Sequence, residues 1–419
     1  MKFEFIANAS GIFKSKNGKT VLLDPWLMDG VFEGSWCHFH KLQTTRSQLQ
    51  DVDAIYLSHI HPDHYDERDF NYRKDIPIFV LDHGLNFLHK NLEAKGYKNL
   101  IKIKNDETIK FEDFEITLYA PFVKNNFFED ESVVGNLIDS AMVIKSDGLV
   151  AFNANDNTPD LEACKYIRKK FRSIDLAMLN YNAAGPYPSC FNNLTDEEKF
   201  FEQDKNLKRN YEYLLSNLRE LKPKYMLPFA GAYTLGGNLS KKNKYLGIGT
   251  WDDCAEYLRR NIDYGTEVIC LRENDEINIA DGSRNKDYIP IDKEEIYSYA
   301  RNELSNIEYD YEKDPEPCLA TMQKDINIAS MKMQERCGRI KLKPDMNVNI
   351  KLEDDIIEIC NSEESKGNLS CSMDNRLLRR ILDRKSHWNN AEIGCHIEFN
   401  RTPNYYSPDI HLMLQFFHL

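Results

Sequence analysis

The chain has 419 residues, 42% of them hydrophobic, and its 54 basic and 67 acidic side chains give a formal net charge of −13. This length predicts two or three domains with sizeable cores, and the acidic balance argues against a nucleic-acid backbone as the main partner. No apolar run reaches the ~18 to 20 residues of a membrane-spanning helix, and ten cysteines without a C-x-x-C pair predict reduced thiols in a cytoplasmic protein.

The chain begins with short predicted strands. Residues 3–6 and 11–14 form two of them, and Asn17-Gly18 suits the positive φ of the turn that follows. The acidic, alternating start of the chain is not that of a signal peptide. Residues 20–23 predict a buried strand that ends at Asp24, where an aspartate can either cap a turn or orient a metal-bound histidine through its second ring nitrogen.

A long predicted loop follows over residues 28–50, and loops of this length in a compact domain usually carry function. It contains two histidines. His40 is a candidate catalytic residue that could line the pocket or contribute to a metal site, and the alternative is a plain surface position. His38 is expected to have a structural role only.

Three histidines and an aspartate fall within six positions after the next predicted strand, residues 54–57. They are His59, His61, Asp63 and His64. Pro62 stops regular structure, so the cluster is expected in a loop at the end of a strand. Imidazoles with a carboxylate suit Zn²⁺, Fe²⁺ or Mn²⁺ better than Ca²⁺. His59 and His61 could hold one ion, with Asp63 and His64 facing a second, whereas a solvated loop with chance histidines is the alternative.

This loop carries the H-x-H-x-D-H signature of the metallo-β-lactamase superfamily. Further segments around it resemble the metallo-β-lactamase-like part of the CMP-N-acetylneuraminate hydroxylases. These segments are Leu23-Asp24-Pro25-Trp26-Leu27, Gly34-Ser35-Trp36 with His40, Pro228-Phe229-Ala230-Gly231, and residues 393–417 around Pro408-Asp409-Ile410. The resemblance implies an α+β fold, the αβ/βα metallo-β-lactamase sandwich, with a catalytic domain over residues 1–280.

Two aspartates at strand ends take roles that this resemblance implies. Asp156 follows the predicted strand 150–155 and would bridge two ions, which a carboxylate can do through its two oxygens. Capping the helix that begins near Pro159 is the alternative. Asp24 would orient a ligand histidine. With the histidine loop, the proposed metal ligands are therefore His59, His61, Asp63, His64 and Asp156, around one or two divalent ions, zinc or iron.

The sequence departs from the superfamily pattern in its histidines. None occurs between His89 and His387, so the first metal site lacks its usual third imidazole. Asp139 could support or replace it, and so could Glu129, Asp130 or Glu131. The turn at residues 228–231 also lacks a histidine, which is typical of the hydroxylase branch. Few protein ligands leave open coordination positions, as a catalytic site requires.

The remaining residues, 281–419, predict a smaller α+β domain that contributes to the substrate pocket. Strands are expected at 348–352, 356–360, 369–373 and 391–399, and helices at 293–307, 320–337 and 375–384. Arg401 could bind a carboxylate or phosphate through two parallel hydrogen bonds, and Asp409 and His411 could reach the same pocket. Lysines 241, 242 and 244 are expected to be surface side chains rather than a substrate patch.

Three functions are compatible with these features. The first is a metal-dependent hydrolase, acting on an ester, amide or phosphoester in an anionic, nucleotide-sugar-like small molecule, with Asp63 orienting or deprotonating water. The alternative is a non-haem iron oxygenase. The paired cysteine–histidine runs of a Rieske cluster are missing, so an oxygenase would need an external electron donor. The third is a metal-stabilised sugar- or nucleotide-binding protein. Neither a nucleic acid nor a membrane span is expected.

Overall fold

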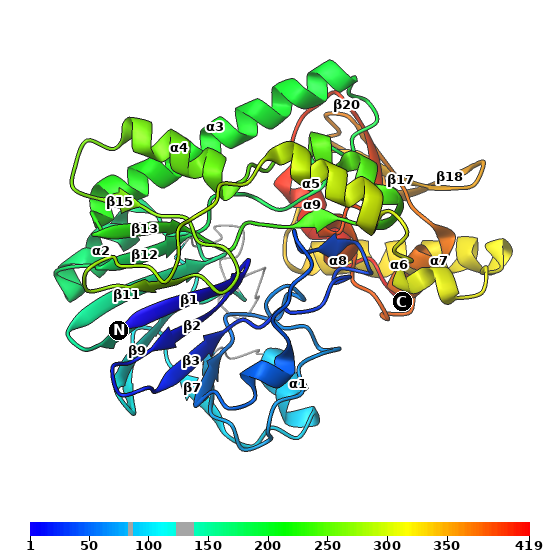
Figure 1. The fold of residues 1–419 in the computed structure, drawn as a ribbon. Coiled ribbons are helices and arrows are strands. Elements are labelled where there is room, and N and C mark those ends of the chain that lie inside the picture. The colour runs from blue at the N-terminus through cyan, green and yellow to red at the C-terminus, as the bar shows by residue number, and fades with distance from the viewer. Residues whose placement is uncertain (83–86, 123–137) are drawn as a thin grey trace.

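The computed structural model describes residues 1–82, 87–122 and 138–419, and its centre is a sandwich of two sheets (Figure 1). In these residues each sheet has seven strands. The first runs in the order β16 (Glu276–Asn278), β1 (Lys2–Ala7), β2 (Ser10–Lys14), β3 (Thr20–Leu23), β5 (Ala54–Tyr56), β6 (Ile78–Leu81), β7 (Leu100–Ile103). The second runs β15 (Glu267–Val268), β13 (Tyr225–Pro228), β12 (Leu176–Leu179), β11 (Leu149–Asn155), β10 (Ala141–Ser146), β9 (Phe114–Tyr119), β8 (Thr108–Phe111).

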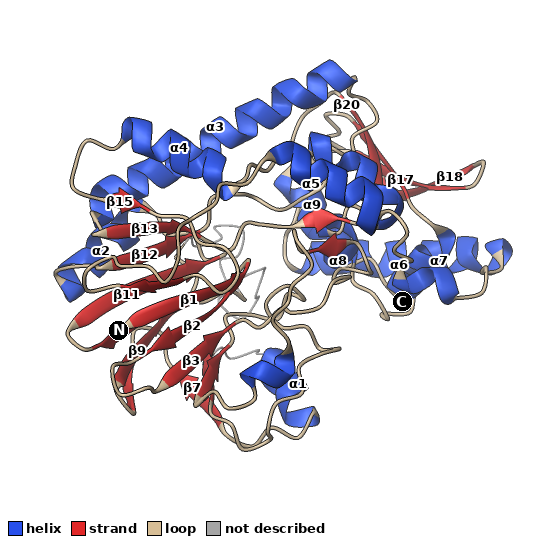
Figure 2. Ribbon diagram, in the orientation of Figure 1, coloured by secondary structure: helices blue, strands red, loops and turns tan. Residues whose placement is uncertain are grey.

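Apolar side chains fill the space between the two sheets, and helices cover the outer faces (Figure 2). The first sheet buries its other face against α1 (Phe87–Ala94). The second is covered by α2 (Leu161–Phe171), α3 (Asp196–Leu221) and α4 (Trp251–Asn261). Each of these three helices begins at a side-chain cap, for example Thr195 and Glu198 in a reciprocal capping box before α3.

The parallel strands of both sheets end at one edge of the sandwich. In the first sheet β3, β5 and β6 are parallel, and in the second β11, β12 and β13 are. The Tyr56 and Ser140 hydroxyl oxygens join the sheets there at 2.8 Å, and the Ser140 hydroxyl donates to the Ser58 carbonyl at 2.7 Å. Ligands of open α/β sheets bind outside the carboxyl ends of their strands, so a binding site is expected at this edge.

The C-terminal residues build a second, smaller layer beside the sandwich. Its sheet has the order β18 (Asp355–Cys360), β17 (Asn347–Leu352), β19 (Asn368–Ser372), β20 (Glu398–Thr402). Its helices are α5 (Lys293–Tyr299), α6 (Leu319–Arg339), α7 (Asn375–Leu382), α8 (Trp388–Ile393) and α9 (Pro408–Leu414). A short ribbon, β4 (Trp36–Cys37) with β14 (Thr234–Leu235), lies between the two parts.

One apolar core spans both parts. It contains Trp36, Phe191 and Tyr233 from the sandwich side together with residues of α6, α8 and the small sheet. The rings of Trp36 and Tyr233 stack 3.5 Å apart at an angle of 3°. The domain boundary between residues 280 and 281 therefore stays a proposal. It would separate the sandwich from the small sheet, but the apolar core is continuous across it. None of the helices in the described ranges combines the length and apolar character that crossing a bilayer requires.

Two sequence predictions in this region are wrong. Residues 391–399 are not one strand, because α8 ends at Ile393 and β20 begins only at Glu398. The His387 side chain accepts from the Asn389 backbone and starts α8, a cap that the alternating apolar pattern hides. Lys242 is not a surface lysine. It is buried, pairs with Glu398 and donates to the Cys190 sulfur at 3.3 Å.

Candidate metal centre

The histidine loop leaves β5 at the edge just described, and Asp24 holds it from the end of neighbouring β3. One Asp24 oxygen accepts from the Ser58 backbone at 2.7 Å, and the other accepts from the Ser58 hydroxyl at 2.7 Å. That second oxygen also lies 3.0 Å from His64 Nδ1, and the Ser58 oxygen lies 2.9 Å from His59 Nδ1. Because Nδ1 of both rings is engaged, Nε2 of both is available to a metal ion.

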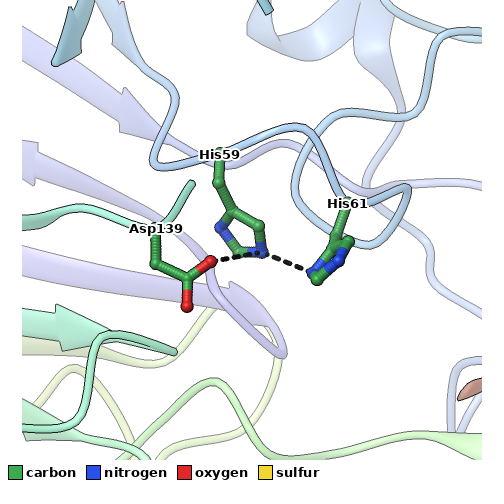
Figure 3. Close-up of side chains that lie close together, drawn as sticks. All are labelled: His59, His61 and Asp139. Atoms are coloured by element: carbon green, nitrogen blue, oxygen red, sulfur yellow. Dashed lines mark hydrogen bonds and ion pairs between the residues drawn. The ribbon is translucent and has the colours of Figure 1, made fainter. Parts of the chain in front are cut away.

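Two groups of side chains converge on this loop with spacings that suit a metal ion. The first contains His59, His61 and Asp139, and the second contains His59, His64 and Asp156. In each group one ligand atom per residue lies within 4.8 Å of the others. Figure 3 shows the first group, in which His59 Nε2 is 2.9 Å from His61 Nδ1 and 3.6 Å from an Asp139 oxygen.

The second group shares His59 with the first. One oxygen of Asp156, just beyond β11, is 3.8 Å from His59 Nε2 and 3.4 Å from His64 Nε2. The His64 Nε2 atom is buried and makes no hydrogen bond among the described residues. A ring nitrogen that is buried without a hydrogen bond, close to carboxylates, fits a cation between them.

The charges of the cluster also fit a bound cation. Burial and, after it, the neighbouring Asp156 carboxylate raise the pKa of Asp139 to about 7. Burial, with the charges of His64 and His61, lowers the pKa of His59 well below its ordinary value and favours the neutral ring that a metal needs. Burial would also lower the pKa of His64, but the surrounding aspartates outweigh it and raise that pKa.

A known family is similar to this part of the chain. The sequence profile of the β-lactamase superfamily domain matches residues 19–197. The match covers less than half of the chain and runs from just before β3 to the start of α3. The match and the two-sheet sandwich confirm the relationship and the α+β fold predicted from the histidine loop.

Curated relatives extend the picture. A protein of Mycolicibacterium smegmatis named as a Rieske 2Fe-2S iron–sulfur protein is 28% identical over 199 residues, which are 46% of this chain and 36% of the relative. A Mycobacterium tuberculosis protein with a similar name is 25% identical over 199 residues, with the same shares. The cytidine monophosphate-N-acetylneuraminic acid hydroxylase of Danio rerio is 22% identical over 229 residues, 52% of this chain and 36% of that enzyme. The matched part thus spans about a third of each relative's length.

Two solved structures are similar to parts of this chain at low identity and at TM-scores below 0.5. CmlA, a diiron β-hydroxylase from Streptomyces venezuelae, has a TM-score of 0.44 at 14% identity, covering 65% of this chain and 53% of CmlA. An isothiocyanate hydrolase from Delia radicum gut bacteria has a TM-score of 0.45 at 18% identity, covering 66% of this chain and 99% of the hydrolase.

Asp63 lies beside the two ligand groups without belonging to either. Its carboxylate accepts from the Asn8 side chain at 3.1 Å and is 3.4 Å from His64 Nε2. Burial alone would raise the pKa of Asp63, but His64 and His61 outweigh it and lower that pKa, so the carboxylate is ionised. Asp63 as ligand or proton acceptor stays a prediction. The capping role considered for Asp156 falls instead to Asp160, whose side chain caps α2.

Three other candidate residues make their contacts away from the two ligand groups. His40 lines a separate cavity near Arg272. Arg401 is buried against the rings of Tyr187 and Phe191 and donates to Asn404, and His411 pairs with Glu392. Within the described ranges, no hydrogen bond or ion pair joins these side chains to the histidine loop. Glu129, Asp130 and Glu131, the alternatives to Asp139, lie outside the described residues.

Two asparagines near the centre escaped the sequence analysis. Asn8 sits between β1 and β2 with a φ of 43°, and its side chain holds Asp63. Asn180 follows β12 directly and donates to Asp156 at 3.1 Å and to the Ala230 carbonyl at 2.7 Å. Asn180 stands at the end of a parallel strand, as Asp156 does, so this position could have marked it as a candidate. The position of Asn8 depends on a β-bulge that no local pattern marks.

Proposed function

We propose that this protein is a metal-dependent enzyme whose ion or ions lie between the histidine loop, Asp139 and Asp156, and that its reaction is an oxygen-dependent hydroxylation at iron. The observation that carries the proposal is the composition of the two groups, each of which offers two imidazoles and one carboxylate. Two histidines and one carboxylate, with the remaining positions open, are the ligand set of non-haem iron oxygenases.

The relatives support the same reaction class. Those compared by sequence carry the names of iron–sulfur proteins and of hydroxylases of a nucleotide sugar. Hydroxylation of a C–H bond by O₂ inserts one oxygen atom, releases the other as water and consumes two electrons and two protons. A separate iron–sulfur or flavin protein would deliver the electrons. The substrate would be an anionic small molecule, of which an N-acyl nucleotide sugar is the example that the hydroxylase relatives suggest.

The residues of the centre would have two roles, metal binding and the orientation of the metal ligands. A bound iron ion would bind and activate O₂. His59, His61 and Asp139 would hold one position, and His64 and Asp156 would hold a second. Asp24 and Ser58 fix the ring orientation of His59 and His64 through Nδ1, so that Nε2 stays directed at the centre.

A metal-dependent hydrolase is the second candidate, and the position of Asp63 favours it. The ionised carboxylate lies beside the ligand groups, near His64, and is available to take a proton. A divalent ion lowers the pKa of a bound water to about 7, and a nearby carboxylate could then accept its proton. The same cluster would cleave an ester, amide or phosphoester without O₂.

Metal analysis after anaerobic purification, followed by two activity assays, separates these candidates. The proposal expects stoichiometric iron and O₂ uptake that depends on a ferredoxin with its NADPH-linked reductase. Zinc together with anaerobic hydrolysis of 4-nitrophenyl acetate or bis(4-nitrophenyl) phosphate would refute it in favour of the hydrolase. His61→Ala should lose both metal and activity. His418→Ala, a histidine change near the C-terminus whose ring contacts the Leu419 carbonyl, is the matched control and should lose neither.

A further inference from the structure

The cavity that His40 lines has a volume of about 270 Å³ and lies next to the metal centre. Its wall comes from the end of β1, the loop at residues 38–42, residues 232–234 and 246–251, and the start of α5. The apolar part of the wall is formed by Phe5, Leu246, Ile248, Trp251, Ile291 and Ile296. This volume is just below the ~300–1,000 Å³ of sites for drug-sized ligands, so a compact organic molecule is the appropriate occupant.

The charged side chains of the cavity are mostly basic, although the protein is acidic overall. Lys286 is paired with Asp275 at 2.8 Å, and Lys293 with Asp253 at 2.9 Å. Glu273, the carboxylate on this wall, accepts from the backbone of residues 43 and 44. Two of the three basic side chains are thus neutralised by acids, and the acid on the wall is occupied by backbone donors.

Arg272 is the basic side chain that remains. Its guanidinium donates to the Pro290 carbonyl at 2.8 Å, its Nε is buried without a hydrogen bond, and no carboxylate in the described residues forms an ion pair with it. His40 is close enough for the Arg272 charge to act with burial in lowering the His40 pKa. A guanidinium is suited to a carboxylate or phosphate, so this wall is complementary to one anionic group.

A thin wall separates the cavity from the metal centre. Asn8 lines the cavity, while its amide donates to Asp63 on the other side. The Ala232 backbone donates to the Asn8 side-chain oxygen at 3.1 Å, and the Ala230 backbone donates to the Asn8 carbonyl at 3.1 Å. Ala230 is in turn held by Asn180, which binds Asp156. The turn after β13 and Asn8 thus form one hydrogen-bonded partition.

We propose that this cavity is a binding site for a compact organic acid, separate from the metal ions. Arg272 binds the carboxylate or phosphate of the ligand, and the apolar wall around Trp251 buries an aromatic or aliphatic body. Trp251 is held for this contact because its indole nitrogen donates to the Tyr288 hydroxyl at 2.6 Å and its ring packs edge-on against Phe5. The acid would lie against the partition that carries Asp63 and Asp156.

Titration of the full-length protein with 4-phenylbutyrate and with its neutral counterpart, 4-phenylbutan-1-ol, tests the proposal by calorimetry. The acid should bind at one site per chain, and at least about tenfold more tightly than the alcohol, because it adds a charge-assisted hydrogen bond. Arg272→Met should abolish this difference and Arg272→Lys should keep part of it. Arg284→Met is the matched control, since Arg284 pairs with Glu267 away from the cavity, and it should bind like the wild type.

Equal affinity for acid and alcohol, a preference that survives Arg272→Met, or no saturable binding of the acid would each overturn the proposal. Thermal unfolding of each variant shows whether it is folded. The titration is repeated with His61→Ala, which removes metal ligation and leaves the cavity intact. If acid binding disappears together with the metal, the ion was the binding site and the cavity proposal fails, while the proposed function stands. If the protein binds the acid but takes up no O₂, the cavity proposal stands and the proposed function fails.

Discussion

The two sides of the partition formed by Asn8 and the turn after β13 have opposite chemistry. On one side Asp63, Asp139 and Asp156 gather around three imidazoles. On the other an apolar wall leaves Arg272 as the basic group without a carboxylate among the described residues. The net charge of the whole chain, −13, does not predict the local charge on either side. What each side can bind follows from the charges that its neighbours leave unpaired, a cation on the first and an organic anion on the second.

The largest effect should come from the histidine that both ligand groups share. Loss of a residue that merely orients a ligand costs about 10–100-fold in metal affinity, so His59→Ala should cost at least about 100-fold. Metal content after dialysis, measured by mass spectrometry, checks this. Binding of 4-phenylbutyrate should be unchanged, because His59 does not line the cavity. Full metal content in this variant would remove the proposed centre.

Asp24→Asn should have the next largest effect, again confined to the metal side. The amide keeps one acceptor but places a donor against Ser58 or His64, so both rings lose their fixed orientation. Metal affinity, measured by competition with a chelator, should fall about 10–100-fold. Asp160→Asn is the matched acid-to-amide control, since asparagine also caps helices well, and it should retain the wild-type affinity.

Gly231→Ala should disturb both sides at once, because it alters the partition itself. An added Cβ would lie 2.9 Å from the Tyr181 ring and 3.3 Å from Asn182 Cβ. Such overpacking costs about 1–3 kcal/mol, visible in denaturant unfolding, and it should weaken both metal and acid binding. Gly265→Ala, where an added Cβ meets nothing within 4 Å, is the control. Equal stability of the two variants would contradict a tightly packed partition.

The smallest expected effect is a pKa shift on the cavity side. The positive charge of Arg272 disfavours protonated His40 and, after burial, is a cause of its lowered pKa. Arg272→Met should therefore move the His40 pKa upward, which NMR titration of the imidazole resonances can follow. Arg284→Met serves again as the control. An unchanged His40 pKa would place Arg272 too far away to act at the cavity mouth.

Sequence reasoning named candidates on the metal side and did not find the cavity. The histidine loop is a contiguous motif, and the family resemblance implied roles for Asp24 and Asp156 at the ends of two predicted strands. These roles stay proposals. Asp139 was one of four acids that could replace the third imidazole. The packing of the two sheets, through the contacts of the adjacent Ser140 with Tyr56 and Ser58, brings it beside His59. Its role as a ligand stays a proposal.

The cavity and the C-terminal contacts could not be predicted, because they depend on segments far apart in the chain. Arg272 and His40 are more than 200 positions apart in the sequence. Lys242 looked like a surface residue because its partners, Glu398 and Cys190, are 156 and 52 positions away in the sequence. The helix at residues 388–393 was missed because apolar and polar residues alternate over residues 391–399, as in a strand, and because its cap, His387, is an unusual one.

The core shared by the sandwich and the C-terminal layer has a practical consequence for anyone who wishes to dissect the protein. Cutting the chain at residue 280 would uncover Trp36, Phe191 and Tyr233, which are buried against α6, α8 and the small sheet. The resulting fragment would expose a large hydrophobic surface to water and would tend to aggregate. Work on the metal centre should therefore keep the whole polypeptide and remove single side chains, not segments.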